Sequence, residues 1–221
     1  MRSQLLTEIR QVLGSAVSPN LTSRSKGYDL YEAYVFSLVV RAAQRSGAQV
    51  RYENTDLSTP TKFVFRTGPG EIASGNYSHA ALSFARKPEL EVHVGIYVSG
   101  VSKIPHEADV CVLLRDEAMF CRGSRVRVFP RYSSVALAAE CKFYESSGIG
   151  VALGRGFMGL SKDFASRQNF FVMSREAMRV KALLAHHKQH WATSIVPNSS
   201  FALNRLIGSF ETVFENFKAK R

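Results

Sequence analysis

Cysteine is scarce in this chain of 221 residues, and the three that occur, Cys111, Cys121 and Cys141, form no Cys-x-x-Cys pair. Two of them fall in predicted buried strands, so we expect small core residues in a reducing compartment. Long hydrophobic runs are also missing. The longest apolar stretch on a predicted helix, residues 33–40, is too short to span a bilayer, and residues 1–14 lack the apolar centre of a signal peptide. We therefore expect a cytoplasmic protein with no membrane segment.

Acidic residues are few relative to basic ones. The chain holds 29 Lys and Arg against 18 Asp and Glu, which gives a net charge of +11 and a pI near 9.8. Such an excess favours a polyanionic partner, because binding releases counterions from a nucleic acid. A basic protein that is merely soluble remains the alternative on charge alone.

Hydrophobic periodicity predicts one mixed fold. Helices are predicted over residues 2–13, 28–46, 147–165, 175–189 and 200–218. Strands are predicted over residues 49–53, 62–66, 79–85, 89–98, 109–114, 135–144, 170–174 and 193–196. This order predicts an α/β (α+β) fold, with a mixed central β-sheet flanked by helices. We expect one domain over residues 1–221, with a core at about 28–200 and the helices 2–13 and 200–218 as additions.

Two predicted strands carry the chemistry. Residues 133–144 form an apolar run that ends in Glu140-Cys141-Lys142, and residues 105–113 form another that carries Asp109. Because side chains alternate along a strand, Glu140 and Lys142 should project to one side and Cys141 to the other. If the two strands pair, Asp109 joins them, and two acids with one lysine are what Mg²⁺-assisted phosphodiester hydrolysis requires.

The chain resembles the PD-(D/E)xK nuclease superfamily, which has the restriction-endonuclease-like fold. The resemblance lies in the order of a helix, then strands that carry Asp and Glu-x-Lys, then a second helix. The resemblance covers about residues 28–160. It departs from the family pattern before Asp109, where Ala108 stands in place of a proline. That proline shapes a turn and does no chemistry, so the departure removes no catalytic group.

The resemblance implies roles for these residues. Asp109, Glu140 and the main-chain carbonyl of Cys141 would coordinate Mg²⁺ or Mn²⁺, which prefer oxygen ligands. Lys142 would orient or help deprotonate the attacking water and offset charge in the transition state. The products would carry 5′-phosphate and 3′-hydroxyl ends.

Two further residues follow from the same resemblance. Glu32, on the flank of the long helix, is a candidate second-metal or water-linked ligand, and its alternative is a boundary glutamate that reaches solvent. Arg155 falls where the family often has a basic residue facing the phosphate, and its alternative is a surface arginine.

Arginines are concentrated between the two catalytic strands. We interpret the segment from Arg115 to Arg131 as the loop of a hairpin, whose arginines on alternate positions track a phosphate backbone. A solvated strand face is the alternative. The arginines concerned are Arg122, Arg125, Arg127 and Arg131.

Two strings favour other chemistry. Residues 154–159 read GRGFMG and match the GxGxxG fingerprint, with residues 151–153 as the preceding strand and Arg175 placed for a 2′-phosphate. Only 62 residues follow, which is short for a dinucleotide-binding domain. His186, His187 and His190 form an HHxxH string, but the glutamate of HExxH is missing, and a polar helix end near Trp191 explains it better.

The leading hypothesis is a metal-dependent endonuclease of a restriction, repair or antiphage system, with DNA favoured over RNA. A non-catalytic nucleic-acid-binding module on the same fold is the alternative, and a dinucleotide-dependent enzyme comes third. A homodimer is a further hypothesis, since a minimal domain that cuts duplex DNA must reach both strands.

Overall fold

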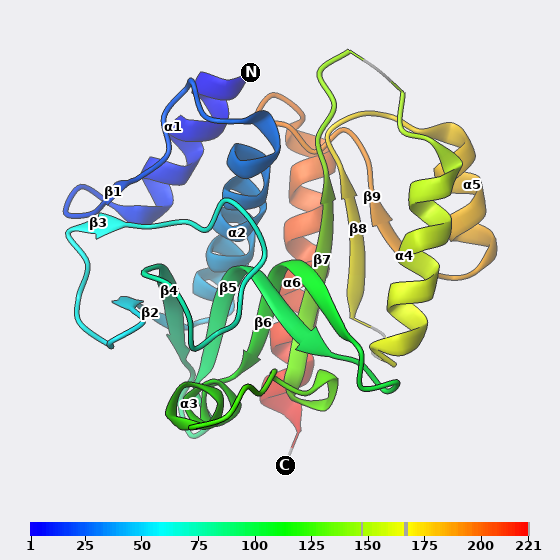
Figure 1. Ribbon diagram of the computed structural model, residues 1–221. Coiled ribbons are helices and arrows are strands. Elements are labelled where there is room, and N and C mark those ends of the chain that lie inside the picture. The colour runs from blue at the N-terminus through cyan, green and yellow to red at the C-terminus, as the bar shows by residue number, and fades with distance from the viewer. Residues whose placement is uncertain (147, 166–167, 221) are drawn as a thin grey trace.

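A seven-stranded mixed sheet runs through the centre of the protein in the computed structural model, which describes residues 1–146, 148–165 and 168–220 (Figure 1). Neighbouring strands pair antiparallel from β2 to β7, whereas β7, β8 and β9 are parallel. The strands in spatial order are β2 (Gln49–Asn54), β4 (Ser78–Ser83), β5 (Leu90–Ser99), β6 (Pro105–Leu114), β7 (Val135–Lys142), β8 (Asn169–Met173) and β9 (His190–Ala192). A separate short parallel pair joins β1 (Ser18–Pro19) to β3 (Lys62–Phe63).

Helices cover both faces of this sheet. The six α-helices of the described residues are α1 (Arg2–Leu13), α2 (Gly27–Arg45), α3 (Arg115–Gly123), α4 (Val151–Asp163), α5 (Met178–His186) and α6 (Ser200–Ala219). Phe170 and Val172 of β8 pack with α1, α2 and α6, while Phe171 and Met173 pack with α4 and α5. This alternation places the two helix groups on opposite faces. The prediction of an α/β protein with a mixed, helix-flanked sheet is confirmed.

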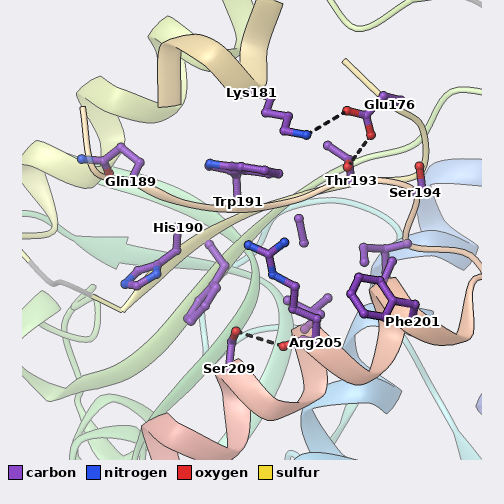
Figure 2. Close-up of a pocket in the computed structure, with 15 residues that line it drawn as sticks. Glu176, Lys181, Gln189, His190, Trp191, Thr193, Ser194, Phe201, Arg205 and Ser209 are labelled. Atoms are coloured by element: carbon purple, nitrogen blue, oxygen red, sulfur yellow. Dashed lines mark hydrogen bonds and ion pairs between the residues drawn. The ribbon is translucent and has the colours of Figure 1, made fainter. Parts of the chain in front are cut away.

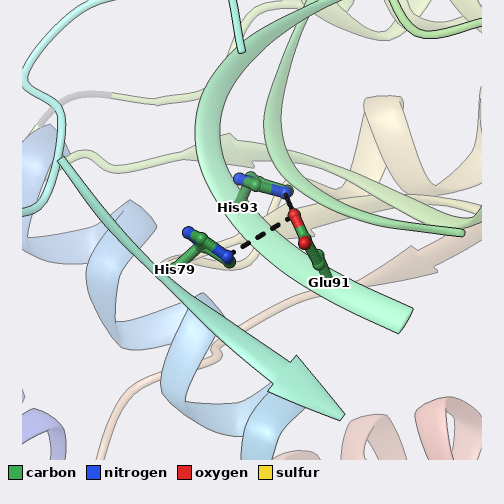
Figure 3. Close-up of side chains that lie close together, drawn as sticks. All are labelled: His79, Glu91 and His93. Atoms are coloured by element: carbon green, nitrogen blue, oxygen red, sulfur yellow. Dashed lines mark hydrogen bonds and ion pairs between the residues drawn. The ribbon is translucent and has the colours of Figure 1, made fainter. Parts of the chain in front are cut away.

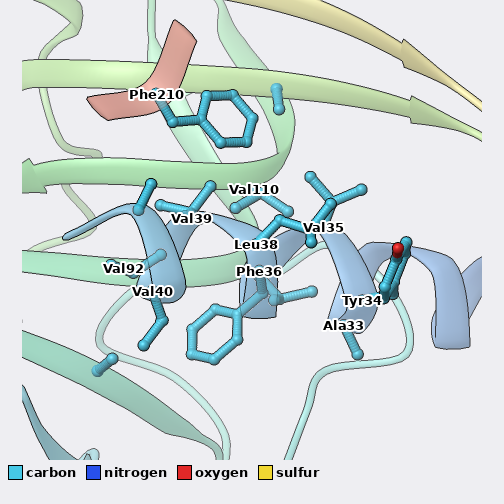
Figure 4. Packing of buried hydrophobic residues seen from close by; sticks show 14 of the residues in the cluster. Ala33, Tyr34, Val35, Phe36, Leu38, Val39, Val40, Val92, Val110 and Phe210 are labelled. Atoms are coloured by element: carbon cyan, nitrogen blue, oxygen red, sulfur yellow. The ribbon is translucent and has the colours of Figure 1, made fainter. Parts of the chain in front are cut away.

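Helix α2 forms the centre of the larger core (Figure 4). Apolar residues line nearly all of it, and Val35, Leu38 and Val39 are fully buried beside Val110 of β6 and Val92 of β5. A helix that is apolar almost all round must be enclosed, and α1 and α6 enclose it on the side away from the sheet. Among the described residues, no helix is both long and apolar enough to cross a membrane.

The segment between β6 and β7 differs from the prediction. Residues 115–123 form α3, not part of a hairpin loop, and residues 124–130, all of them described, form no strand. Asp116 and Glu117 lie in the first turn, where acids favour a helix, and Ala118 and Cys121 supply a buried face three residues apart. The alternating Arg and Val residues at 125–128 had suggested a β-ribbon, and that prediction is wrong.

Three further boundaries shift. The last strand lies at His190–Ala192 instead of 193–196, because Ser194 has a φ of 57°, in the left-handed region that interrupts extended backbone. Helix α5 ends at His186, which is earlier than predicted. Helix α4 begins at Val151, and residue 147, where we expected it to begin, lies outside the described residues.

The GRGFMG string lies wholly inside α4, and residues 151–153 form the first turn of that helix instead of a strand. A dinucleotide fingerprint requires the order strand, turn, helix, which this segment does not have. Gly154 has a different role, because a Cβ there would lie 3.1 Å from Val180 of α5. The glycine therefore lets α4 and α5 approach closely.

Candidate active site

The structure brings Asp109, Glu140 and Lys142 together at the adjacent strands β6 and β7. Nζ of Lys142 lies 2.5 Å from Oε1 of Glu140 and 3.8 Å from Oδ2 of Asp109. The backbone N–H of Cys141 donates a hydrogen bond of 2.6 Å to Oδ2 of Asp109. The ammonium group therefore bridges two carboxylates from neighbouring strands.

A cavity of about 580 Å³ opens beside this group. It lies between the first turns of α2, the loop that contains Thr67 to Pro69, and the carboxyl end of β7. Glu140 is not among the lining residues and reaches the cavity through Lys142. The titratable residues that line it are Tyr28, Asp29, Glu32, Glu107, Asp109, Cys141, Lys142 and Tyr144.

The carboxyl groups around this cavity resist ionisation. Burial raises the pKa of Asp109 to about 7, with a further contribution from Glu140, while Lys142 and the Cys141 N–H act in the opposite direction. Burial also raises the pKa of Glu32 to about 9, and Asp109, Glu107 and Asp29 add to this effect. Burial therefore favours the protonated forms of Asp109 and Glu32 in the absence of a bound cation.

The same carboxyl groups change the pKa of Lys142. Burial opposes its charged form, but Asp109 and Glu140 outweigh burial and raise the pKa of Lys142 above its ordinary value. The side chain is therefore a fixed cation at neutral pH and can donate hydrogen bonds to an anionic ligand.

The donor set suits a hard divalent cation in its chemistry. Carboxylate oxygens of Asp109 and Glu140, with Glu32 lining the same cavity, are the ligands that Mg²⁺ and Mn²⁺ prefer. Among the described residues, the carboxyl oxygens of these three side chains do not all lie within 4.8 Å of one another. Lys142 lies between two of them, so a bound cation requires its ammonium group to move aside.

The predicted arginines do not line this cavity. Arg122 is nearly buried and pairs with Glu91, Arg131 pairs with Glu117 at 2.6 Å, and the exposed Arg127 pairs with Glu71 at 2.6 Å. The predicted ribbon is therefore absent, because α3 and its ion pairs take up this segment, whereas contact of these arginines with phosphate stays a prediction. Arg125 and Arg155 are exposed, the latter on α4.

A second polar group lies at β4 and β5 and was not anticipated from the sequence (Figure 3). His79, Glu91 and His93 are fully buried, and their ligand atoms all lie within 4.8 Å of one another. Nε2 of His93 lies 2.9 Å from Oε2 of Glu91, and Nε2 of His79 lies 3.5 Å from the same oxygen. Two imidazoles and a carboxylate could hold a metal ion.

Two arginines of α3 contact this second group. Arg122 contacts Glu91 and lies 3.2 Å from Nε2 of His79, while Arg115 lies 3.0 Å from Oε1 of Glu91. Burial opposes ionisation of Glu91, but its hydrogen bonds with His79 and His93 outweigh that effect and lower its pKa. Burial lowers the pKa of His93 to about 4. The group thus places a charged Glu91 beside a neutral His93, and Arg115 and Arg122 join that carboxylate to α3.

The HHxxH string does not form one helical face. His186 is the last residue of α5 and His190 is the first of β9, so the spacing of a helical metal-binding pair is lost. The rings of His186 and His187 contact each other instead, with centroids 5.0 Å apart.

Comparison with protein-family models, with curated proteins and with solved structures finds no match. The site must therefore be interpreted from its own geometry.

Proposed function

We propose that the protein is a metal-dependent phosphodiesterase that acts on nucleic acid, as a DNA endonuclease of the restriction, repair or antiphage kind. The observation that carries this proposal is the contact of Lys142 with both Glu140 and Asp109 beside an acid-lined cavity. The arrangement of elements supports it, since Asp109 and Glu-x-Lys lie on the paired strands β6 and β7, with α2 before them and α4 after them in the chain.

The carboxylates would hold the metal. Asp109 and Glu140, with Glu32 across the cavity and the Cys141 carbonyl as a further oxygen, would ligate Mg²⁺ or Mn²⁺. When bound, that ion supplies a Lewis acid and an acidified water at neutral pH. A bound cation would favour the charged forms of Glu32 and Asp109, whose pKa values burial and neighbouring carboxyl groups raise.

Lys142 would act on the substrate side. Its raised pKa keeps it protonated, so it donates hydrogen bonds and stabilises charge on phosphate oxygens instead of acting as a base. With the carboxylates holding a cation, the ammonium group of Lys142 would be free to turn toward the cavity that it lines. The net charge of +11 favours approach of a polyanion.

The alternative is a nucleic-acid-binding module with the same fold and no catalysis. The arrangement of the acids favours it, because Lys142 contacts both Glu140 and Asp109 and the carboxyl oxygens of these two acids and Glu32 do not all lie within 4.8 Å of one another. Binding without cleavage in every metal would support this alternative.

A cleavage assay separates the two. Supercoiled plasmid, linear duplex, single strands and RNA are incubated with Mg²⁺, Mn²⁺ or EDTA. The variants are Glu140→Gln and Lys142→Met, with Glu215→Gln and Lys162→Met as matched controls on α6 and α4. We expect metal-dependent cleavage that both site variants lose and both controls keep. Cleavage that persists in Glu140→Gln would overturn the proposal.

A further inference from the structure

A cavity of about 360 Å³ lies at the β9 edge of the sheet, between α5 and α6 (Figure 2). Its centre is Trp191, the only tryptophan of the chain, which lies on β9 between Lys181 on one side and Arg205 on the other. The ring of His190 stacks on Phe170 at a centroid distance of 5.0 Å, and Phe201 is 83% exposed at the rim. Aromatic surface is therefore concentrated at one opening.

Two cations face the indole of Trp191. Nζ of Lys181 lies 5.1 Å and Cζ of Arg205 lies 5.7 Å from a Trp191 ring centroid. Both distances lie within the roughly 6 Å of a cation–π contact, so each cation interacts with the ring. A planar ligand that stacks on the indole would take the place of one cation, and a cation–π contact at an exposed site is weak.

The two cations differ in their partners. Glu176 lies 3.6 Å from Lys181 and accepts a hydrogen bond of 2.6 Å from Thr193, so this acid offsets the lysine charge. The guanidinium of Arg205 has no hydrogen bond or ion pair with any of the described residues. An arginine at a cavity wall with free donors suits a phosphate.

A ligand that matches these features has a flat aromatic part and an anionic part. We propose that the cavity binds one nucleotide unit, with its base on the indole of Trp191 and its phosphate on the guanidinium of Arg205. Stacking on an aromatic side chain accepts any base, so the site is expected to show little sequence preference.

The sheet register connects this cavity with the candidate active site. Glu140 of β7 pairs with Phe171 of β8, and Phe171 pairs with Trp191 of β9. The three residues form one row across parallel strands, so Trp191 lies two strand spacings, about 10 Å, from Glu140. A nucleic-acid strand bound at the active site is one source of a nucleotide for Trp191, at that distance but not along the row itself, because Phe171 is fully buried. Binding of a strand that comes from the active site rests on the proposed function, whereas binding of a free nucleotide in this cavity does not.

The single tryptophan gives a direct readout. Fluorescence of the full chain is titrated in EDTA with deoxyadenosine monophosphate in one arm and a single-stranded DNA 12-mer in the other, corrected with free tryptophan amide. We expect quenching of Trp191 by the 12-mer. Quenching by both ligands identifies a site for any nucleotide, and quenching by the 12-mer alone identifies a site for a strand. No quenching by either ligand overturns the proposal.

Variants locate the binding. Arg205→Gln should weaken binding roughly tenfold, while Arg179→Gln, on the exposed side of α5, should leave it unchanged. Binding to the Trp191 variants is measured by the anisotropy of a labelled 12-mer. Trp191→Ala should weaken binding about tenfold or more. Trp191→Phe should restore most of the affinity, which would not happen if the loss in Trp191→Ala came from a folding defect. Equal affinity of Arg205→Gln and wild type contradicts the assignment. Quenching of Trp191 by the 12-mer without cleavage of any substrate would contradict only the proposed function. Cleavage of DNA without quenching of Trp191 would contradict only this nucleotide site.

Discussion

The backbone N–H of Cys141 donates a 2.6 Å hydrogen bond to Oδ2 of Asp109, which joins the strand of the Glu-x-Lys motif to a carboxylate on its neighbour. Because both strands lie in the middle of the sheet, this contact fixes the spacing of the acids and Lys142 before any ligand binds. The site is thus built on rigid strands instead of loops.

Removing the ammonium group should destabilise the metal-free protein. Lys142→Met leaves Asp109 and Glu140 facing each other without a cation, so in EDTA we expect the free energy of unfolding to fall by about 1–3 kcal/mol. Mg²⁺ should restore part of this loss, because it offsets the same charge. Urea unfolding with EDTA and with Mg²⁺ measures both effects. An equal loss in the exposed control Lys162→Met would refute this account of Lys142.

The pairing of α3 with the sheet should depend on Arg122. Its guanidinium contacts the fully buried Glu91, and loss of one partner from a buried pair costs about 3–5 kcal/mol. We expect Arg122→Gln to lower the free energy of unfolding by an amount of that order, while the exposed Arg125→Gln leaves it unchanged within error. Thermal and urea unfolding of both variants check this. A mild effect of Arg122→Gln would show that the buried group does not hold α3.

The free energy of unfolding should fall at low pH because His93 is buried. Burial lowers the pKa of His93 to about 4, whereas the unfolded chain has an ordinary histidine value of about 6.5. The unfolded state therefore binds the proton first, and stability that is fully present above about pH 6.5 is lost as the pH falls toward 4. The difference of about 2.5 units corresponds to roughly 3 kcal/mol at most.

Urea unfolding at pH 7 and pH 4.5 tests this dependence. Wild type should lose more stability over that interval than His93→Gln, which lacks the titrating group. His187→Gln, at an exposed histidine after α5, should behave as wild type. Identical pH profiles for wild type and His93→Gln would contradict the argument.

Much of the fold follows from local patterns. The apolar surface of α2 and the alternation of Glu140, Cys141 and Lys142 are both readable within a few residues, and the structure contains the helix and the lysine–glutamate contact they suggest. Helix α3 was missed because its buried face has only Ala118 and Cys121 with Glu117, too short a pattern to outweigh the Arg and Val alternation after it.

The remaining features depend on pairing between strands that are distant in sequence. His79 and Glu91 lie on separate strands, and only the register of β4 on β5 brings them together. The row from Glu140 to Trp191 likewise depends on two parallel pairings. No local pattern specifies such a register.

The most direct test of the central claim is a single-turnover cleavage rate on end-labelled duplex DNA with Mg²⁺, compared between wild type and Glu140→Gln. The account predicts products with ligatable 5′-phosphate and 3′-hydroxyl ends, and a rate at least about a hundredfold lower in the variant. Equal rates in the two proteins, or no metal-dependent cleavage by wild type, would contradict it.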